Sequence, residues 1–470
     1  MNKRPFTNTI FGDARLSLRA NFVIQEIVSS GTSVINRVHT TMSEKVGAYR
    51  LLNNDRVSVD SITKAYYEDC RISTVQSGCE HVLCLQDTCE INYEAHSKRM
   101  HKDGKSPGIV SNNETGCFLH ACLAINAGTC LPLGFSYLKM WNRKEGSPNS
   151  RERRYKTLPR REKESIRWSD AIDQSGSLIR SPVMTTVISD RESDIYDVLS
   201  RGDDTLKILV RSNQGRRIMD DSCNVRDYIR KQPVRGTFKL TIPHSHDRKE
   251  RVAEIQVQFS VVHFKRPASA PMSAYPDVTL NCIRVSEVEG SCPQGEEPLE
   301  WILLTNHEVT SVEQALKCVD WYRCRWYIEE FFRLLKKKGF AIEDIQLENI
   351  QSLEKNILLV SYATMLTITL KQAFDKPEEY MQVPADQYFS EDEVETAYLL
   401  SPSVNGRTKI TTNPYPEKSL PWMAWIIARL GKWSGYLSQS RPGYTTFKRG
   451  LDNLYSKSEL LKIVKDVYKG

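Results

Sequence analysis

The sequence predicts a mixed α/β protein with a β-rich insertion and a helical domain at each end. With 470 residues the chain is too long for one simple core, so two or three domains are expected. Apolar residues make up 40% of the chain and charged residues 26%, as in an ordinary globular protein. The apolar pattern changes from helical spacing to short runs between polar turns, then to long β-rich runs, and then back to helices.

The first expected domain, residues 1–65, is helical. The stretch ARLSLRANFVIQEIVSSG is an amphipathic helix that ends at Gly31, and two further helices follow, with Ser58 or Asp60 as a candidate N-cap. Two interpretations of this domain stay open: it binds DNA, or it is a helical cap whose arginines are solvated. Both concern the same basic side chains, Arg15, Arg19, Arg37, Lys45 and Arg50.

The second expected domain, residues 66–370, holds a mixed five-stranded sheet flanked by helices. Three apolar runs come first and are typical of strands: HVLCLQDTCEINY, FLHACLAINAG and CLPLGFSYLKMWNR. A charged helix, the strand MTTVISD, a second helix and the strand KILVRS complete a layer with helices on both faces. Residues from about 215 to 306 are an insertion of long β-rich runs separated by Pro- and Gly-rich linkers.

The third expected domain, residues 371–470, is again helical. Before it, the apolar run Ile357–Leu370 lies between Lys355 and Lys371 and is about a third too short to span a bilayer, so we expect a buried helix. The N-terminal residues lack the apolar core of a signal peptide. We therefore expect a soluble protein that is not exported by a classical signal.

Charge and cysteine content restrict the class of protein only slightly. The formal net charge of +7 weakly favours a polyanionic partner. The twelve cysteines are scattered, form no CxxC pair and are not followed by histidines at zinc-finger spacing. We interpret them as small buried residues rather than zinc ligands.

Two of the predicted strands end in an aspartate, Asp87 in LCLQDT and Asp190 in TVISDRESD. Either residue alone is most simply a turn or capping residue. Together, two acids at strand ends of one sheet can converge on a divalent cation with oxygen ligands, such as Mg²⁺. A pair of such cations supports in-line phosphoryl displacement, for which a third carboxylate on a rigid element is needed.

The segment DWYRCRWYIEEFFRLLKKKG, residues 320–339, is the best candidate to supply the third acid. On a continuous helix, an apolar stripe docks the segment, and the adjoining arc of about 60° presents Tyr322, Arg325, Glu329 and Lys336. This arc is either a solvated charged face or a face that binds metal through its acid and phosphates through its neighbours. The same helical wheel places Glu330 about 100° away from Glu329.

These motifs resemble those of the DDE transposases of the IS four group, typified by the transposase of the Tn five transposon. The run Tyr322-x2-Arg325-x3-Glu329-x6-Lys336 is similar to the Y-R-E-K motif of this family. TVISDRESDIY is similar to its second-aspartate motif, and LCLQDTCEINY to its first-aspartate strand. Further similarity covers nearly the whole chain, in GDARLSLRAN, VGAYRLLNN, EKESIRW, VRSNQGRR, EWILLT and IARLGKWSG.

The resemblance implies a ribonuclease-H-like catalytic core with the β insertion between the second aspartate and the glutamate. It implies that two Mg²⁺ ions, for which Mn²⁺ can substitute, are bound by the catalytic acids Asp87, Asp190 and Glu329. Phosphate contacts near the cleaved DNA end would come from Tyr322, Arg325 and Lys336. Trp301 would stack on a flipped base, and Arg211 would make another contact to the end DNA.

The activity implied by the resemblance is cut-and-paste transposition of an insertion sequence. Its steps are nicking at the 3′ end, hairpin formation, hairpin opening and strand transfer into target DNA. The implied partners are double-stranded DNA, as transposon ends and as target, and a second copy of the chain in a synaptic homodimer, with no membrane involved. The N-terminal domain would bind the transposon end, the C-terminal domain would dimerise, and the location would be the bacterial cytoplasm, at the nucleoid.

Two other functions stay open on the sequence alone. A nuclease or resolvase of the ribonuclease-H fold would cleave DNA without joining it, but the β insertion and the Y-R-E-K segment favour a transposase. A DNA-binding regulator that has lost catalysis would inhibit transposition through mixed dimers, but the three acids are intact.

Overall fold

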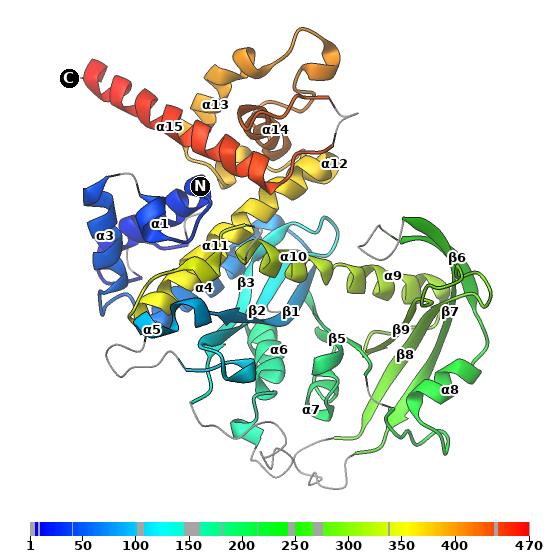
Figure 1. Cartoon of the computed structure of the whole chain (residues 1–470). Helices are drawn as coiled ribbons and strands as arrows, with labels where there is room; N and C mark the ends of the chain where they lie inside the picture. Colours follow the sequence, from blue (N-terminus) through cyan, green and yellow to red (C-terminus); the bar gives the residue numbers. More distant parts are fainter. Residues whose placement is uncertain are drawn as a thin grey trace.

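One mixed sheet of nine strands forms the centre of the protein, with helices packed on both of its faces (Figure 1). Each face carries a cluster of buried apolar side chains. The computed structural model describes residues 5–7, 10–39, 41–100, 108–144, 160–179, 182–213, 215–242, 250–266, 276–336, 339–436 and 440–469.

The strands lie in the order β3-β2-β1-β4-β5-β9-β8-β7-β6. The pairs β1–β4 and β4–β5 are parallel, and all other neighbours are antiparallel. The bounds are β1 His81–Asn92, β2 Gly116–Asn126, β3 Pro132–Trp141, β4 Met184–Ser189, β5 Leu206–Arg211, β6 Gly236–Ile242, β7 Arg251–Phe264, β8 Val278–Glu287 and β9 Glu300–Thr305.

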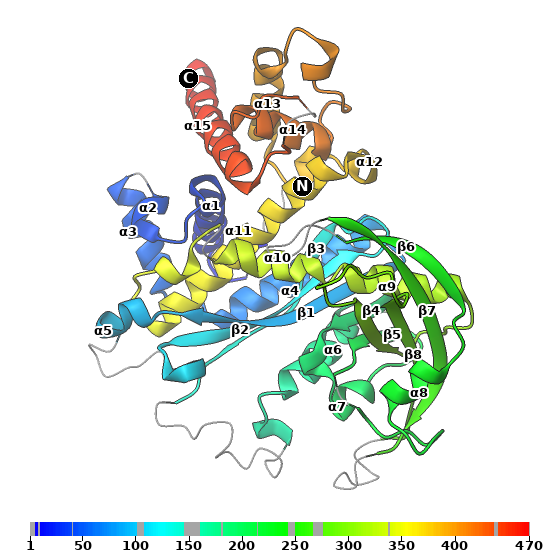
Figure 2. The ribbon, with the colours of Figure 1, turned by 45° about the vertical axis from the view of Figure 1, so that its right-hand side comes forward.

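The expectation of a five-stranded sheet is wrong, because the insertion extends the same sheet instead of forming a separate layer. A five-stranded sheet would leave β5 at an edge with unpaired backbone groups, and β9 covers this edge by pairing Leu303 with Arg211. The insertion is β-rich as predicted, but it also contains a short helix, α8 (Val225–Lys231), which packs against β7 and β8 (Figure 2).

The side chains of β1 alternate between the two faces of the sheet. Leu83 and Leu85 belong to the apolar cluster that includes α10 and α11, whereas Val82 and Cys84 belong to the cluster that includes α6. Because both faces are covered, the strand is a continuous apolar run rather than an alternating one. These helices are α6 Ile166–Leu178, α10 Trp326–Leu335 and α11 Ile350–Asp375.

The predicted continuous helix over residues 320–339 is wrong in one respect: the chain forms two helices, α9 (Val312–Arg323) and α10. Between them the backbone N–H groups of Cys324 and Arg325 bond three residues back, to Trp321 and Tyr322. This is a turn of about three residues instead of 3.6, which rotates the later side chains relative to a regular α-helix.

Helices from both ends of the chain pack around α11, with α1 against α11 and α15, and α14 against α11 and α15 (Figure 1). As predicted, Gly31 ends α1 in the left-handed region, at φ 56°, and Ser58 caps α4 by accepting the Ser61 N–H. Both expected domain boundaries, at residues 65 and 370, fall inside helices, α4 and α11. The remaining helices are α1 Ala14–Ser30, α2 Ile35–Val38, α3 Met42–Leu52, α4 Val59–Ser77, α5 Ser97–Met100, α7 Tyr196–Leu199, α12 Pro377–Tyr380, α13 Glu391–Val404, α14 Leu420–Leu430 and α15 Tyr444–Lys469.

Among the described residues, α11 is the one helix long and apolar enough to cross a membrane by length and composition. It has 26 residues, so the expectation that this segment is too short to span a bilayer is wrong. The expectation of a buried helix is confirmed, since 89% of its most apolar window is buried inside the protein. This burial is consistent with a soluble protein. The prediction of buried cysteines is confirmed for eight of the twelve, all of which are free thiols, and the other four are half-buried.

Candidate active site

Asp87 lies on β1, and Asp190 directly follows β4, its parallel neighbour. The pairing of β1 with β4 is in register up to Leu85 opposite Ile188, and the two aspartates stand two positions further along their strands. Leu85 and Ile188 belong to the apolar cluster beneath α10 and α11, so the strand period of two directs both aspartates to that face. β1 itself continues to Asn92 through its pairing with β2. The prediction that Asp87 ends the strand is therefore wrong. Asp87 instead lies just beyond the part of β1 that pairs with β4.

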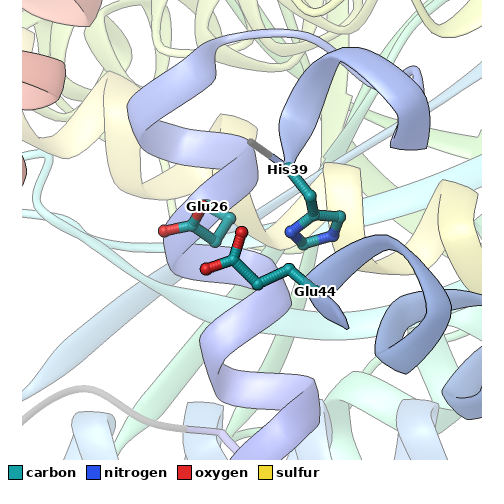
Figure 3. A group of neighbouring side chains, drawn as sticks. All are labelled: Glu26, His39 and Glu44. Atoms are coloured by element: carbon teal, nitrogen blue, oxygen red, sulfur yellow. The ribbon is translucent and has the colours of Figure 1, made fainter. Parts of the chain in front are cut away.

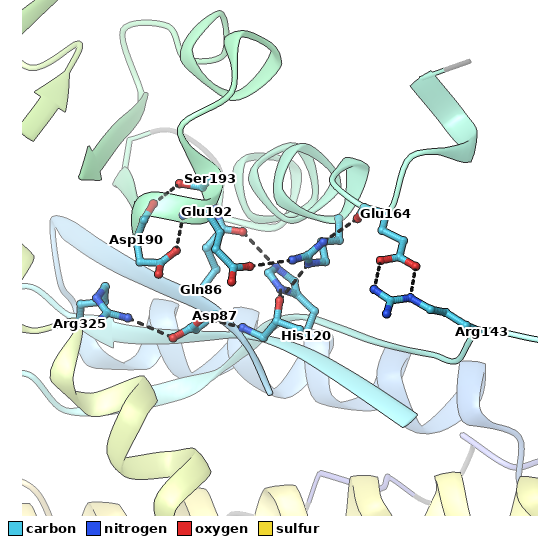
Figure 4. Close-up of polar contacts among 11 residues, drawn as sticks. Gln86, Asp87, His120, Arg143, Glu164, Asp190, Glu192, Ser193 and Arg325 are labelled. Carbon is cyan, nitrogen blue, oxygen red and sulfur yellow. Dashed lines mark hydrogen bonds and ion pairs between the residues drawn. The ribbon is translucent and has the colours of Figure 1, made fainter. Parts of the chain in front are cut away.

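Arg325 connects Asp87 with Glu329, the third predicted acid. Its guanidinium donates to Oδ2 of Asp87 at 3.0 Å and to a carboxylate oxygen of Glu329 one turn along α10. Figure 4 shows Arg325 reaching Asp87 beside Asp190. The side chains of Asp87 and Glu329 are 21% and 36% exposed, so the group is accessible to solvent from one side.

The acids of this group outnumber the cation that neutralises them. Burial raises the pKa of Asp87 to about 6, and the charges of Asp190 and Glu329 act in the same direction. The Thr88 N–H, which donates to Asp87 Oδ1 at 2.7 Å, and the Arg325 guanidinium act against them. The net effect is an excess of negative charge at this edge of the sheet, which favours the binding of a further cation.

The loop after β4 uses its acids in different ways. Asp190 Oδ1 accepts the Glu192 N–H at 2.9 Å and caps the turn that follows. Asp194 is fully buried, pairs with Arg216 at 2.8 Å and accepts the Asn213 N–H at 2.7 Å. Of these two aspartates in the DRESD motif, the first thus faces the other acids, while the second holds the loop in place.

A hydrogen-bonded network on the α6 side of β1 was not predicted from the sequence (Figure 4). Arg167 donates to Thr88 Oγ1 at 2.9 Å and pairs with Glu192 at 3.2 Å. The Thr88 hydroxyl lies 2.8 Å from His120 Nδ1, and His120 Nε2 lies 3.1 Å from Gln86 Oε1. Because burial lowers the pKa of His120, a neutral ring that accepts from Thr88 and donates to Gln86 satisfies every contact. The network therefore holds Thr88, which is next to Asp87, and Glu192, which is two positions after Asp190. Its sequence signal, the EKESIRW stretch, contains Arg167 but does not reveal its partners.

Tyr322, Trp301 and Arg211 form a second group beside Arg325. The rings of Trp301 and Tyr322 meet edge to face, with centroids 5.4 Å apart. Burial raises the pKa of the Tyr322 hydroxyl, and the charges of Arg325 and Arg211 act against it. The pairing of β5 with β9 brings Arg211 and Trp301 together, since Arg211 Nη2 donates to the carbonyl of Glu300 at 3.4 Å. Trp301 therefore lies on β9, the strand that extends the sheet beyond the five predicted strands.

The remaining predicted site residue, Lys336, pairs with a different acid. Lys336 follows the C-terminal end of α10, and its ammonium group lies 3.6 Å from Glu343, which also accepts the Asn92 N–H at the far end of β1. Glu330 pairs with Arg333 and interacts with Tyr444 of α15, away from Asp87. The predicted site residues other than Lys336 are thus collected at one end of the neighbouring strands β1, β4, β5 and β9 and on α9 and α10. In a comparison with protein-family models, no family model matches the chain.

Proposed function

We propose that the chain is a DDE transposase that catalyses Mg²⁺-dependent cut-and-paste transposition. The observation that carries this proposal is the grouping of Asp87, Asp190 and Glu329 around Arg325 on a partly exposed edge of the sheet. The sequence resemblance assigns these same three acids to catalysis. The strand order β3-β2-β1-β4-β5, with only β1–β4 and β4–β5 parallel, supports a ribonuclease-H-like core within the larger sheet.

The three acids fit divalent Mg²⁺. They offer only carboxylate oxygens, the hard donors that Mg²⁺ prefers, and burial together with the charges of Asp190 and Glu329 raises the pKa of Asp87 to about 6. Asp87, Asp190 and Glu329 would hold the ions, and Mn²⁺ would substitute. When bound, Mg²⁺ supplies activation of the attacking hydroxyl group and charge stabilisation at the leaving oxygen.

The residues around the acids would position the DNA. Arg325 and Arg211 present guanidinium groups suited to bidentate binding of phosphate, next to the buried Tyr322 ring. Trp301 is half-buried at the same place, where an aromatic face can stack on an extruded base. Lys336 would contact phosphates farther along β1.

The helical regions would complete the assembly. The N-terminal helices, which carry Arg15, Arg19, Arg37, Lys45 and Arg50, would bind the transposon end, and the C-terminal helices would form the homodimer. In such a dimer each subunit binds one DNA end and cleaves the other. We place this activity at the nucleoid in the bacterial cytoplasm.

A plasmid that carries the DNA flanking this reading frame tests the proposal. The purified chain with Mg²⁺ should nick the plasmid at the element ends, and Asp190→Ala should abolish nicking. Asp170→Ala, on α6, is the matched control, because Asp170 pairs with Lys139 at 3.3 Å outside the group of acids. Nicking that is unchanged in Asp190→Ala would contradict the assignment of the site.

The same reaction separates the two other functions. A nuclease or resolvase would nick the plasmid but would not join the released end to target DNA. A regulator without catalysis would bind the element ends, and neither the wild-type chain nor Asp190→Ala would nick the plasmid. Joined products that require both Mg²⁺ and Asp190 are expected only from a transposase.

A further inference from the structure

A second group of possible metal ligands lies in the N-terminal helices, on different elements from the three acids. Glu26 lies on α1, His39 directly follows α2, and Glu44 lies in the first turn of α3 (Figure 3). One ligand atom of each residue lies within 4.8 Å of the others. Three elements therefore direct one imidazole and two carboxylates toward a common point.

His39 is a buried polar side chain without a partner. It is 2% exposed, and neither Nδ1 nor Nε2 has a hydrogen-bond partner. The ring stacks on Phe22 with centroids 6.3 Å apart and an interplanar angle of 13°, so the contact engages the face of the ring and not its nitrogens. Native proteins pair almost all such buried groups, and an unpaired one points to a ligand that is bound in the working protein.

The spacing of the group suits a metal ion better than a direct hydrogen bond. The imidazole nitrogens form no hydrogen bond with either carboxylate, yet the ligand atoms stay within 4.8 Å of one another. A tetrahedral ion with bonds of about 2.1 Å holds its ligand atoms roughly 3.4 Å apart, which small side-chain rotations reach from this arrangement. Glu44 Oε2 also accepts the Thr41 N–H at 3.0 Å, which fixes this carboxylate on the helix.

The charges around the group also favour a cation. Burial, together with the charges of Glu44, Glu459 and Asp452, raises the pKa of Glu26 to about 7. Burial lowers the pKa of His39, which keeps the ring in its neutral, ligating form. Arg19 and Lys45 act on His39 as positive neighbours. Four acids thus face two basic side chains here.

We propose that Glu26, His39 and Glu44 bind one transition-metal dication of the Zn²⁺ type and that this ion ties α1, α2 and α3 together. An imidazole with carboxylates selects such an ion over Mg²⁺, which prefers oxygen donors alone. Three protein ligands leave one position for water. The site does not depend on the proposed transposase activity, because none of its residues belongs to the group around Arg325.

Titration of the full chain with Co²⁺, followed by visible d–d absorption, tests the site. The wild-type chain should bind Co²⁺ with an absorption typical of nitrogen and oxygen ligands, without the near-ultraviolet charge-transfer band of cysteine thiolates, and Zn²⁺ should displace it. His39→Ala and Glu26→Gln should each weaken binding by at least the roughly 10- to 100-fold known for the loss of a supporting residue at metal sites. His96→Ala is the control, since His96 lies in a short turn after β1 and outside the group.

Glu26→Gln keeps the test valid if His39→Ala does not fold, because the amide has the same size and Glu26 is only half-buried. Zn²⁺ should also raise the Tm of the wild-type chain and of His96→Ala, but not of Glu26→Gln. Absence of the Co²⁺ absorption in the wild-type chain, or undiminished binding in Glu26→Gln, would overturn the proposal.

Discussion

Arg325 has a role in the structure that the sequence motif did not reveal. In the motif it is one of four polar residues on a helix face, expected to contact DNA. In the structure it is the counter-ion of Asp87 and Glu329 at once, with a side chain only 16% exposed. A guanidinium in this position competes with a metal ion for the same carboxylates, and the phosphates of a DNA substrate would draw it away.

Substitution of Arg325 by Ala should therefore separate metal binding from DNA cleavage. Above pH 8, where Asp87 is ionised, we expect Mn²⁺ to bind Arg325→Ala about 5-fold more tightly, since a partly exposed ion pair contributes up to about 1 kcal/mol. Cleavage of element ends should fall. The signal of free Mn²⁺ in electron paramagnetic resonance measures the affinity, and loss of Mn²⁺ binding in this variant would contradict the competition.

At the scale of elements, the sequence predicted which segments form strands and helices but not how their ends meet. The apolar run of β1 could be predicted because burial on both faces leaves a continuous apolar pattern. The aspartates could be recognised because they interrupt such runs. The register of β1 on β4, which decides that Asp87 and Asp190 share a face, depends on long-range pairing. The pairing of β5 with β9 has the same origin. The break at Cys324 was hidden because no Gly or Pro marks it, and the tertiary contact of Arg325 with Asp87 outweighs local propensity.

The junction of β1, β4 and α9 also contains two histidines, of which His307 is buried and His81 is half-buried. Thr186 Oγ1 lies 2.7 Å from Nε2 of both His81 and His307, and both rings contact Trp321. The hydroxyl can donate to one ring while it accepts from the other, which requires that the ring accepting its proton is neutral. Burial lowers the pKa of His81 to about 4 and that of His307 to about 3, and nearby Lys317 acts in the same direction.

These histidines predict that the protein loses stability in mild acid. Below about pH 6.5 these histidines bind protons in the unfolded chain but not in the folded chain. The free energy of unfolding is therefore constant with respect to them above this pH and falls toward pH 4. The loss is about 1.4 kcal/mol per pH unit for each histidine. Thermal unfolding of the wild-type chain and of His307→Gln between pH 7.5 and 5 checks this, with a smaller decrease in Tm expected for the variant. An equal decrease in both would show that other groups control the acid sensitivity.

At the scale of the whole molecule, the last helix offers a surface for a second copy of the chain. The first half of α15 packs on α14 and on α1, whereas its last turns expose an apolar stripe at intervals of three and four residues. The stripe consists of Leu460, Ile463, Val464 and Val467, which are 50–71% exposed. Such a stripe is typical of a helix that pairs with another helix, as the proposed homodimer requires.

Glutamate on this stripe should weaken the dimer. We expect the double variant Leu460→Glu/Val464→Glu to shift the chain from dimer to monomer in light scattering coupled to size-exclusion chromatography, in the presence of DNA ends. Val75→Glu is the matched control, because Val75 is 68% exposed on α4. A dimer that persists in the double variant would place the interface elsewhere.

The most direct test of the central claim compares two neighbouring glutamates of α10. Glu329 joins Asp87 through Arg325, whereas Glu330 pairs with Arg333 on the side of α15. Glu329→Gln should reduce Mg²⁺-dependent cleavage of the element ends by at least about 1,000-fold, the effect of losing a group that stabilises the transition state. Glu330→Gln should cleave at nearly the wild-type rate. Equal activity in the two variants, or cleavage that persists in Glu329→Gln, would contradict the account.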